Sequence, residues 1–250
     1  MTDIQNEISN RIIYEDNHII VVNKLPGEIV QGDKSGDEPL VERVREYIRD
    51  KYRKPGNVFC GLVHRLDRPV GGLVIFAKTS KSLSRLNEML RDGEIHKTYW
   101  AISRQKPPKA EQTLTHYIKS TERNNKSYAS ATPRNGAKEA RLAYRLLASS
   151  ERYNLIEVKL FTGRKHQIRV QLSAIGCPIR GDLKYGDRRS NPDGSISLIA
   201  HELAFVHPVS KKMIRLAAPV PDDNLWKALA ESICLDHPQD SLSDNQMNIK

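Results

Sequence analysis

The sequence has no apolar run long enough to cross a membrane, and it is poor in cysteine and in aromatic residues. Its 250 residues include three cysteines, and 6% are Phe, Trp or Tyr. A membrane-spanning helix needs about 20 predominantly apolar residues, and the polar opening residues do not predict a secretory signal. Three widely spaced cysteines argue against a disulfide framework. The sequence therefore predicts a cytoplasmic protein with reduced thiols.

Common cofactor and metal motifs are also missing. The chain contains no GxGxxG, GxxxxGK[ST] or GxSxG pattern, which removes the usual nucleotide-cofactor and serine-hydrolase signals. His201 and His207 have no matching cysteine or carboxylate cluster, so their spacing does not predict a zinc site. The residues by themselves therefore give no signal for a nucleotide cofactor or a zinc site.

Positive charge is in excess. Forty Lys and Arg against thirty Asp and Glu give a formal charge of +10. Between Arg104 and Arg145 there are ten Lys or Arg against three Glu, and the stretch from Arg164 to Arg189 is similarly biased. Tyrosines lie among these basic residues, which is typical of a surface that holds phosphates and stacks on bases. A basic protein that binds no polyanion is the alternative interpretation.

Hydrophobic periodicity predicts a mixture of strands and helices without a regular βαβ order, which favours the α+β class. One folded unit is expected over residues 11–235, with a flexible leader over 1–10 and a disordered tail over 236–250. Residues 104–140 are polar and rich in turn-forming residues, which predicts an irregular surface insertion. Four helices are expected: one from Pro39 to before Pro55, one from Ser80 to Gly93, one from Arg164 to Ile175, and a last one that begins at a cap on Asp222 or Asp223.

A charged turn separates two apolar runs in "CGLVHRLDRPVGGLVIFAKT", residues 60–79. Asp67 stands in this turn between Arg65 and Arg68. An aspartate before Arg-Pro is an ordinary turn residue, but a carboxylate on a loop between strand ends can also be a nucleophile or a general base. Either catalytic role requires the ionised form, which a nearby cation favours.

The stretch "FTGRKHQIRVQLSAIG", residues 161–176, supplies such a cation. On a helix, His166, Arg169 and Ser173 share one face beside the apolar stripe. Arg169 could form a bidentate ion pair with Asp67, although a basic helix that faces solvent explains the same run of basic residues. Tyr99, in the alternating run "HKTYWAIS", is by default an aromatic residue at the edge of the core.

Three segments together resemble the RluA-type pseudouridine synthases: His64-Arg65-Leu66-Asp67, Lys97-Thr98-Tyr99-Trp100-Ala101 and Gly163-Arg164-Lys165-His166-Gln167-Ile168-Arg169. The resemblance extends from about Ile12 to Pro221 and includes "EDNHIIVVNK", "GCPIRGDLKYGD" and "AHELAFVHP". It implies the family's fold, a large mixed and mostly antiparallel sheet with flanking helices and a central cleft for RNA. It also implies isomerisation of uridines in tRNA or rRNA to pseudouridine, a reaction that needs no metal, nucleotide or redox cofactor.

The resemblance assigns roles to individual residues. Asp67 matches the essential carboxylate, which attacks the anomeric carbon or the base, or supports a glycal route. Tyr99 matches the tyrosine that packs on the base, and Arg169 matches the arginine paired with the aspartate. The expected RNA-binding and base-flipping residues are Arg65, His64, Arg68, Arg164, Lys165 and His166. A non-catalytic RNA-binding or ribosome-assembly factor with the same fold is the alternative, and a monomer that does not bind membranes is expected.

The chain departs from the family pattern at a few positions. Val70-Gly71-Gly72 replaces the common Thr-Ser-Gly after the aspartate, which predicts a looser loop. The proline in "NKLPG" is displaced by one residue, and Gln171 stands where a histidine often occurs. About ten residues precede the first expected strand, so we expect a short form without the N-terminal RNA-binding domain of many relatives.

Overall fold

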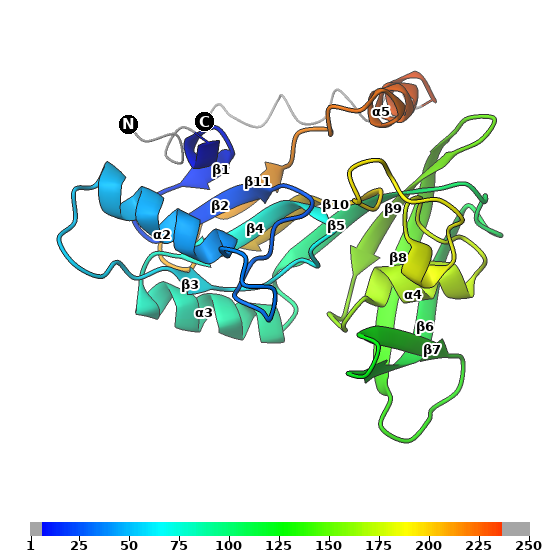
Figure 1. Ribbon diagram of the computed structural model, residues 1–250, viewed down its shortest axis with the longest axis horizontal. Helices are drawn as coiled ribbons and strands as arrows, with labels where there is room; N and C mark the ends of the chain where they lie inside the picture. The colour runs from blue at the N-terminus through cyan, green and yellow to red at the C-terminus, as the bar shows by residue number, and fades with distance from the viewer. Residues whose placement is uncertain (1–6, 237–250) are drawn as a thin grey trace.

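The structure, a computed structural model, describes residues 7–236, in which eleven strands form one mixed sheet (Figure 1). Neighbouring strands pair antiparallel except β4 with β10, which are parallel. The α+β class and the mostly antiparallel sheet are therefore confirmed. The order across the sheet is β1 (Ile12–Glu15), β2 (Ile19–Lys24), β4 (Gly71–Ala77), β10 (Leu198–Val206), β5 (His96–Ser103), β9 (Asn154–Leu160), β8 (Lys138–Ser149), β6 (Glu111–Thr121) and β7 (Lys126–Ser130), with β3 (Gly61–Leu62) beside β4 and β11 (Met213–Ala217) beside β10.

Helices α2 (Leu40–Lys51) and α3 (Ser80–Arg91) cover opposite faces of β4. Successive side chains of a strand point to opposite faces, and every residue of β4 is buried. Val74 and Phe76 pack in the cluster that contains the apolar face of α2, whereas Ile75 packs in the cluster that contains α3. The uninterrupted apolar run after the charged turn is thus explained by burial on both faces.

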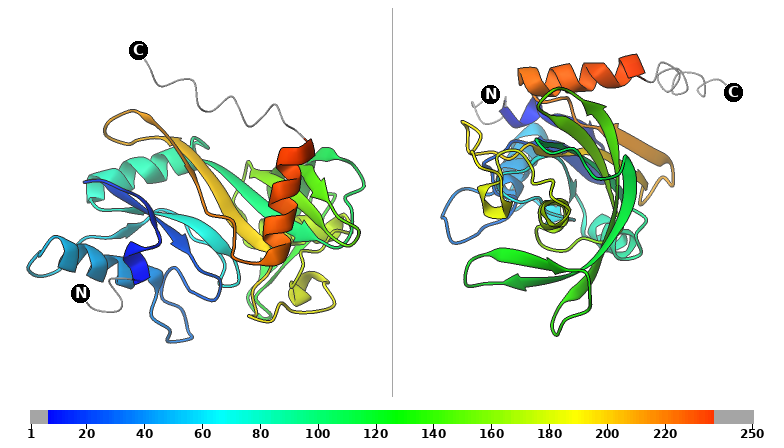
Figure 2. Two further views of the ribbon diagram at one scale, coloured as in Figure 1. Left: turned by 90° about the horizontal axis from the view of Figure 1, so that it is seen from above. Right: turned by 90° about the vertical axis from the view of Figure 1, so that its right-hand side faces the viewer.

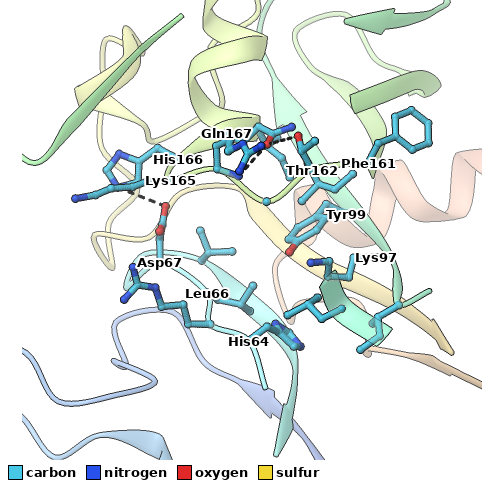
Figure 3. Close-up of a pocket in the computed structure, with 18 of the residues that line it drawn as sticks. His64, Leu66, Asp67, Lys97, Tyr99, Phe161, Thr162, Lys165, His166 and Gln167 are labelled. Carbon is cyan, nitrogen blue, oxygen red and sulfur yellow. Dashed lines mark hydrogen bonds and ion pairs between the residues drawn. The ribbon is translucent and has the colours of Figure 1, made fainter. Parts of the chain in front are cut away.

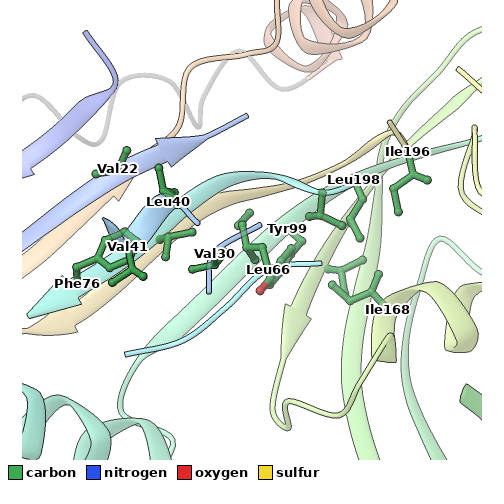
Figure 4. Close-up of a cluster of buried hydrophobic side chains, with 14 of the residues drawn as sticks. Val22, Val30, Leu40, Val41, Leu66, Phe76, Tyr99, Ile168, Ile196 and Leu198 are labelled. Carbon is green, nitrogen blue, oxygen red and sulfur yellow. The ribbon is translucent and has the colours of Figure 1, made fainter. Parts of the chain in front are cut away.

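The second half of the sheet, β6 to β9, curves around the short helix α4 (Gln167–Ala174), and α5 (Asn224–Asp236) packs on its other side (Figure 2). Leu66, Tyr99 and Ile168 belong to the same buried cluster as Phe76, so this cluster extends from α2 to α4 (Figure 4). Within residues 7–236, none of the helices has the length and apolar character that a membrane span requires.

Residues 104–140 do not form an irregular insertion. They contain the strands β6 and β7, which pair antiparallel, and β8 follows them. Leu114 and Ile118 are buried while the side chains between them are more exposed. The polar side chains on the rest of β6 hid this pattern of alternate burial, which is the ordinary signature of a strand with one face in the core.

Some predicted boundaries also differ. The leader expected over residues 1–10 falls partly outside the described residues, but Ile8 is fully buried and Glu7 pairs with Arg43, so the chain is already packed at residues 7 and 8. The expected tail lies outside the described residues except for Asp236, which ends α5. Helix α4 begins at Gln167 rather than Arg164, and Thr79 rather than Ser80 caps α3, since its hydroxyl accepts the Ser82 N–H.

Gly72 occupies a position that no other residue fits. Its φ is +107°, and a Cβ there would lie 2.3 Å from the carbonyl oxygen of Ala200, its partner across the parallel β4–β10 pair. We expect Gly72→Ala to lower the free energy of unfolding in a urea titration by about 3 kcal/mol or more. Gly32→Ala, where a Cβ meets nothing within 4 Å, should change it by less than about 0.5 kcal/mol. Equal stability of the two variants would contradict this account.

Candidate active site

A cleft of about 730 Å³ opens between the two halves of the sheet. Its walls come from the turn between β3 and β4, the end of α3, strand β5 and the turn before α4 (Figure 3). Asp67, Tyr99 and Arg169, which the sequence predicted to act together, all line it. Most of the predicted set is therefore brought to one place although it comes from three separate segments.

Asp67 contacts its two basic neighbours through one carboxylate oxygen, Oδ2. Arg169 Nη1 donates to Asp67 Oδ2 at 3.2 Å, and His166 Nε2 lies 3.7 Å from the same oxygen. The side chain of Asp67 is 32% exposed while that of Arg169 is 6% exposed. The carboxylate therefore lies at the surface of the cleft, and the cation that faces it is buried beneath it.

Arg169 forms its bidentate ion pair with Asp182, not with Asp67. Its Nε and Nη2 donate to the two carboxylate oxygens of Asp182 at 2.7 and 2.9 Å. Asp182 occupies the Nε and Nη2 side of the planar guanidinium, and Asp67 receives one hydrogen bond from Nη1. Burial tends to lower the pKa of Arg169, but the Asp182 hydrogen bonds and both carboxylate charges raise it overall. The arginine is therefore a fixed cation.

A buried lysine fixes the turn that carries Asp67. Lys24 is 1% exposed, and its ammonium donates to the carbonyl oxygens of Leu25, Arg68 and Val70 at 2.9, 3.1 and 2.6 Å. Burial lowers its pKa to about 8. The Val70 N–H also donates to the Asp67 carbonyl oxygen at 3.0 Å. With Gly72 fixed by β10, these contacts show that the turn is not the loose loop expected from Val70-Gly71-Gly72.

Tyr99 projects from β5 with its hydroxyl directed into the cleft (Figure 3). Burial, with a smaller contribution from the Asp67 charge, raises the pKa of Tyr99. Its phenol is therefore protonated at neutral pH and can donate a proton but not begin as a base. Burial also lowers the pKa of the neighbouring Lys97 and, with the Lys97 charge, that of His64 to about 3.

The rim of the cleft is cationic. Among the described residues that line it, Asp67 is the one carboxylate, against the basic side chains of Arg65, Arg91, Lys97, Arg164, Lys165 and Arg169. Arg65, Arg164 and Lys165 are exposed. Phe161 is also exposed at this rim, with the Arg141 guanidinium 5.7 Å from its ring centre. Such a rim can bind phosphates and offers a flat ring to a base.

Three of the predicted RNA-binding residues are held by contacts within the protein, although His64 and His166 also line the cleft. Arg68 does not line the cleft and instead pairs with Asp37 and Asp33. The His64 ring accepts the Ile75 N–H at 3.3 Å through Nε2, and His166 is buried, 8% exposed. The geometry therefore shows both histidines in contacts within the protein.

Sequence reasoning missed Asp182, Tyr185 and Lys24 as parts of this site. The first two belong to "GCPIRGDLKYGD" and the third to "EDNHIIVVNK", segments that carried the family resemblance without a role. A signal was present: a carboxylate, a tyrosine and a lysine in motifs otherwise made of turn and strand residues. The contacts that define their roles join residues far apart in the chain, and sequence pattern does not provide such distances.

Comparisons with known proteins point in one direction. Residues 18–174 match the family model described as RNA pseudouridylate synthase. Ribosomal large subunit pseudouridine synthase C of Buchnera aphidicola is 31% identical, over 90% of this chain and 71% of that protein. An RNA pseudouridine synthase of Synechocystis, described as uncharacterized, is 32% identical over 84% of this chain and 65% of that protein. The chain thus spans about two thirds of the length of these relatives.

A solved structure supports the fold. The human protein named RNA Pseudouridylate Synthase Domain Containing 4 superposes with a TM-score of 0.74, covering 92% of this chain and 95% of that one. The two sequences are 22% identical, so this likeness concerns the fold alone.

Proposed function

Since the chain belongs to the RNA pseudouridylate synthase family, we propose that it converts a uridine of large-subunit ribosomal RNA to pseudouridine in the cleft around Asp67. The RluA-type resemblance of the three motifs is confirmed by this membership, and the family's enzymes are isomerases. The observation that supports the role of Asp67 is its position as the one carboxylate among the described residues of a cationic cleft, held by a buried arginine.

The reaction moves one bond and one proton. The bond between uracil N1 and ribose C1′ breaks, the base turns within the cleft, and a bond forms between C5 and C1′. C5 then loses a proton and N1 gains one, so atoms and electrons balance without an oxidant or reductant. Asp67 is the group that reacts with the nucleoside, and Tyr99 packs against the turning base with its phenol protonated.

The target uridine must leave its stack before Asp67 can reach it, at a cost of a few kcal/mol. Arg65, exposed beside Asp67, occupies the space of the displaced base, and the cationic rim holds the backbone. Large-subunit ribosomal RNA is the proposed substrate because relatives that are about 30% identical are named for it. The cleft is complete within one chain, which supports a monomer, and the thiols of Cys60 and Cys177 are free, in keeping with the cytoplasm.

The test uses unmodified transcripts of 23S-type ribosomal RNA, 16S-type ribosomal RNA and a tRNA pool, each incubated with the purified protein. New pseudouridines are mapped by carbodiimide adducts and primer extension. We expect discrete stops in the large-subunit transcript alone. Stops only in tRNA would overturn the substrate, and RNA binding without any stop would favour the non-catalytic alternative. Initial rates should fall steeply with salt because basic side chains hold the phosphates.

A further inference from the structure

His166 joins Asp67 to a hydrogen-bonded chain that runs away from the cleft. Its Nδ1 lies 2.8 Å from the Tyr185 hydroxyl, and its Nε2 lies 3.7 Å from Asp67 Oδ2. The ring is almost fully enclosed. A residue that binds RNA directly, as the sequence predicted for His166, would need a more open ring.

The donors show which way each hydrogen bond in this series points. The backbone N–H of Ser127 donates to the Tyr185 hydroxyl at 2.8 Å, and the Ser127 hydroxyl donates to the Lys165 carbonyl oxygen at 2.7 Å. The buried phenol has one proton of its own to place. Among the hydrogen bonds of residues 7–236, His166 Nδ1 is the acceptor that faces it. Nδ1 therefore accepts, and a neutral ring carries its proton on Nε2.

The surroundings keep the ring neutral. Burial lowers the pKa of His166 to about 4, although the Asp67 charge opposes this shift. The positive charges of Arg169, Lys184 and Lys165 also disfavour a second proton. Burial raises the pKa of Tyr185, so the phenol keeps the proton that it donates.

The backbone holds this arrangement. His166 has a φ of +56°, in the left-handed region that residues other than glycine adopt uncommonly, and such residues cluster at functional sites. Tyr185 is fixed in turn, because the Ser173 hydroxyl donates to its carbonyl oxygen at 2.6 Å. The segment from Asp182 to Tyr185 thus holds both Arg169 and His166, the two side chains that approach Asp67.

We propose that His166 is a positioning residue that presents Nε2–H to Asp67 Oδ2, and that Tyr185 fixes the tautomer that makes this possible. Arg169 and His166 then both bind Oδ2. Oδ1 has no hydrogen-bond partner among the described residues and is the oxygen that reacts with the nucleoside. The present 3.7 Å is long for a hydrogen bond, and contacts of this kind tighten when substrate is bound. The proposal rests on the proposed function of Asp67.

The first test observes the ring without substrate. Protein labelled with ¹⁵N-histidine is studied by long-range ¹H–¹⁵N correlation, with the His166→Gln spectrum used to assign the signal. At pH 7 we expect a neutral ring with the proton on Nε2 in the wild type. Tyr185→Phe should shift the ring toward a mixture of tautomers, since Nδ1 loses its donor. A charged ring, or a proton on Nδ1 in the wild type, overturns the proposal.

The second test compares His166→Ala with His166→Gln, because both lose the same backbone preference but glutamine keeps a side-chain N–H. We expect His166→Ala to lower kcat about 10- to 100-fold, the worth of one hydrogen bond to a charged group, with KM for RNA within twofold of wild type. His166→Gln should recover most of kcat. An unchanged kcat with a raised KM in His166→Ala assigns the residue to RNA binding and overturns the proposal. An inactive wild type counts against the proposed function, while the tautomer result stands independently.

Discussion

Replacing Asp67 with asparagine is expected to lower kcat by about 10⁴-fold or more, the loss typical of removing the reacting group of an enzyme. The amide keeps the size of the side chain and can still accept the Arg169 N–H, so the fold should not change. RNA affinity should be equal or slightly higher, because one negative charge is removed from a cationic cleft. Single-turnover rates on the modified transcript and filter binding of the same RNA measure the two quantities.

Asp222→Asn is the matched control for this variant. It removes one carboxylate charge at an exposed position paired with Lys227, outside the cleft. Its kcat and its RNA affinity should both equal those of the wild type. If Asp67→Asn turned over RNA at the control's rate, Asp67 would not be the reacting carboxylate, whatever its position in the cleft.

The second large effect is expected at Arg169. Arg169→Met removes the donor that orients Asp67, and displacement of a reacting group by about 1 Å can cost about 100-fold in rate. The same change leaves the Asp182 carboxylate, 1% exposed, buried without its partner. We therefore expect kcat to fall at least about 100-fold and the free energy of unfolding to fall by about 3–5 kcal/mol. Rapid-quench kinetics and urea titration measure these changes.

A double variant separates the two effects. In Arg169→Met/Asp182→Asn the buried charge is removed together with its partner, so most of the stability should return. Turnover should remain low, because the double variant still lacks the Arg169 Nη1 donor and His166 Nε2, 3.7 Å from Asp67 Oδ2, does not replace it. If turnover returned together with stability, Arg169 would matter only for folding. If the single variant lost RNA affinity but kept kcat, Arg169 would be a phosphate contact.

The fold was largely predictable because local patterns carried it. The helix ending before Pro55 and the Asp223 cap of α5 both appear as expected. Residues 104–140 were predicted wrongly because a basic, turn-rich composition was given more weight than the alternate burial positions of Leu114 and Ile118. A strand that exposes one face to solvent has few apolar residues, and its pattern is easily lost among charges.

The site was predictable only in part. His166, Arg169 and Ser173 all contact the segment from Asp182 to Tyr185, as a shared face predicts, but His166 lies before α4 and not on the helix. What that face contacts could not be derived from periodicity. Arg169 contacts Asp182, thirteen positions away in the chain, and Asp67, 102 positions away. The carboxylate that is nearer in the sequence, Asp182, makes the bidentate contact. The catalytic roles of Asp67, Tyr99 and Arg169 remain predictions that the experiments above test.

Strand β10 lies between β4 and β5, although β4 and β5 follow one another in the chain. During synthesis the edge of β5 that faces β10, and Gly71 and Gly72 of β4, therefore stay unpaired until residues 198–206 have been added. An open strand edge is a template for wrong pairing. The late arrival of β10 thus lengthens the time during which the nascent chain can pair wrongly.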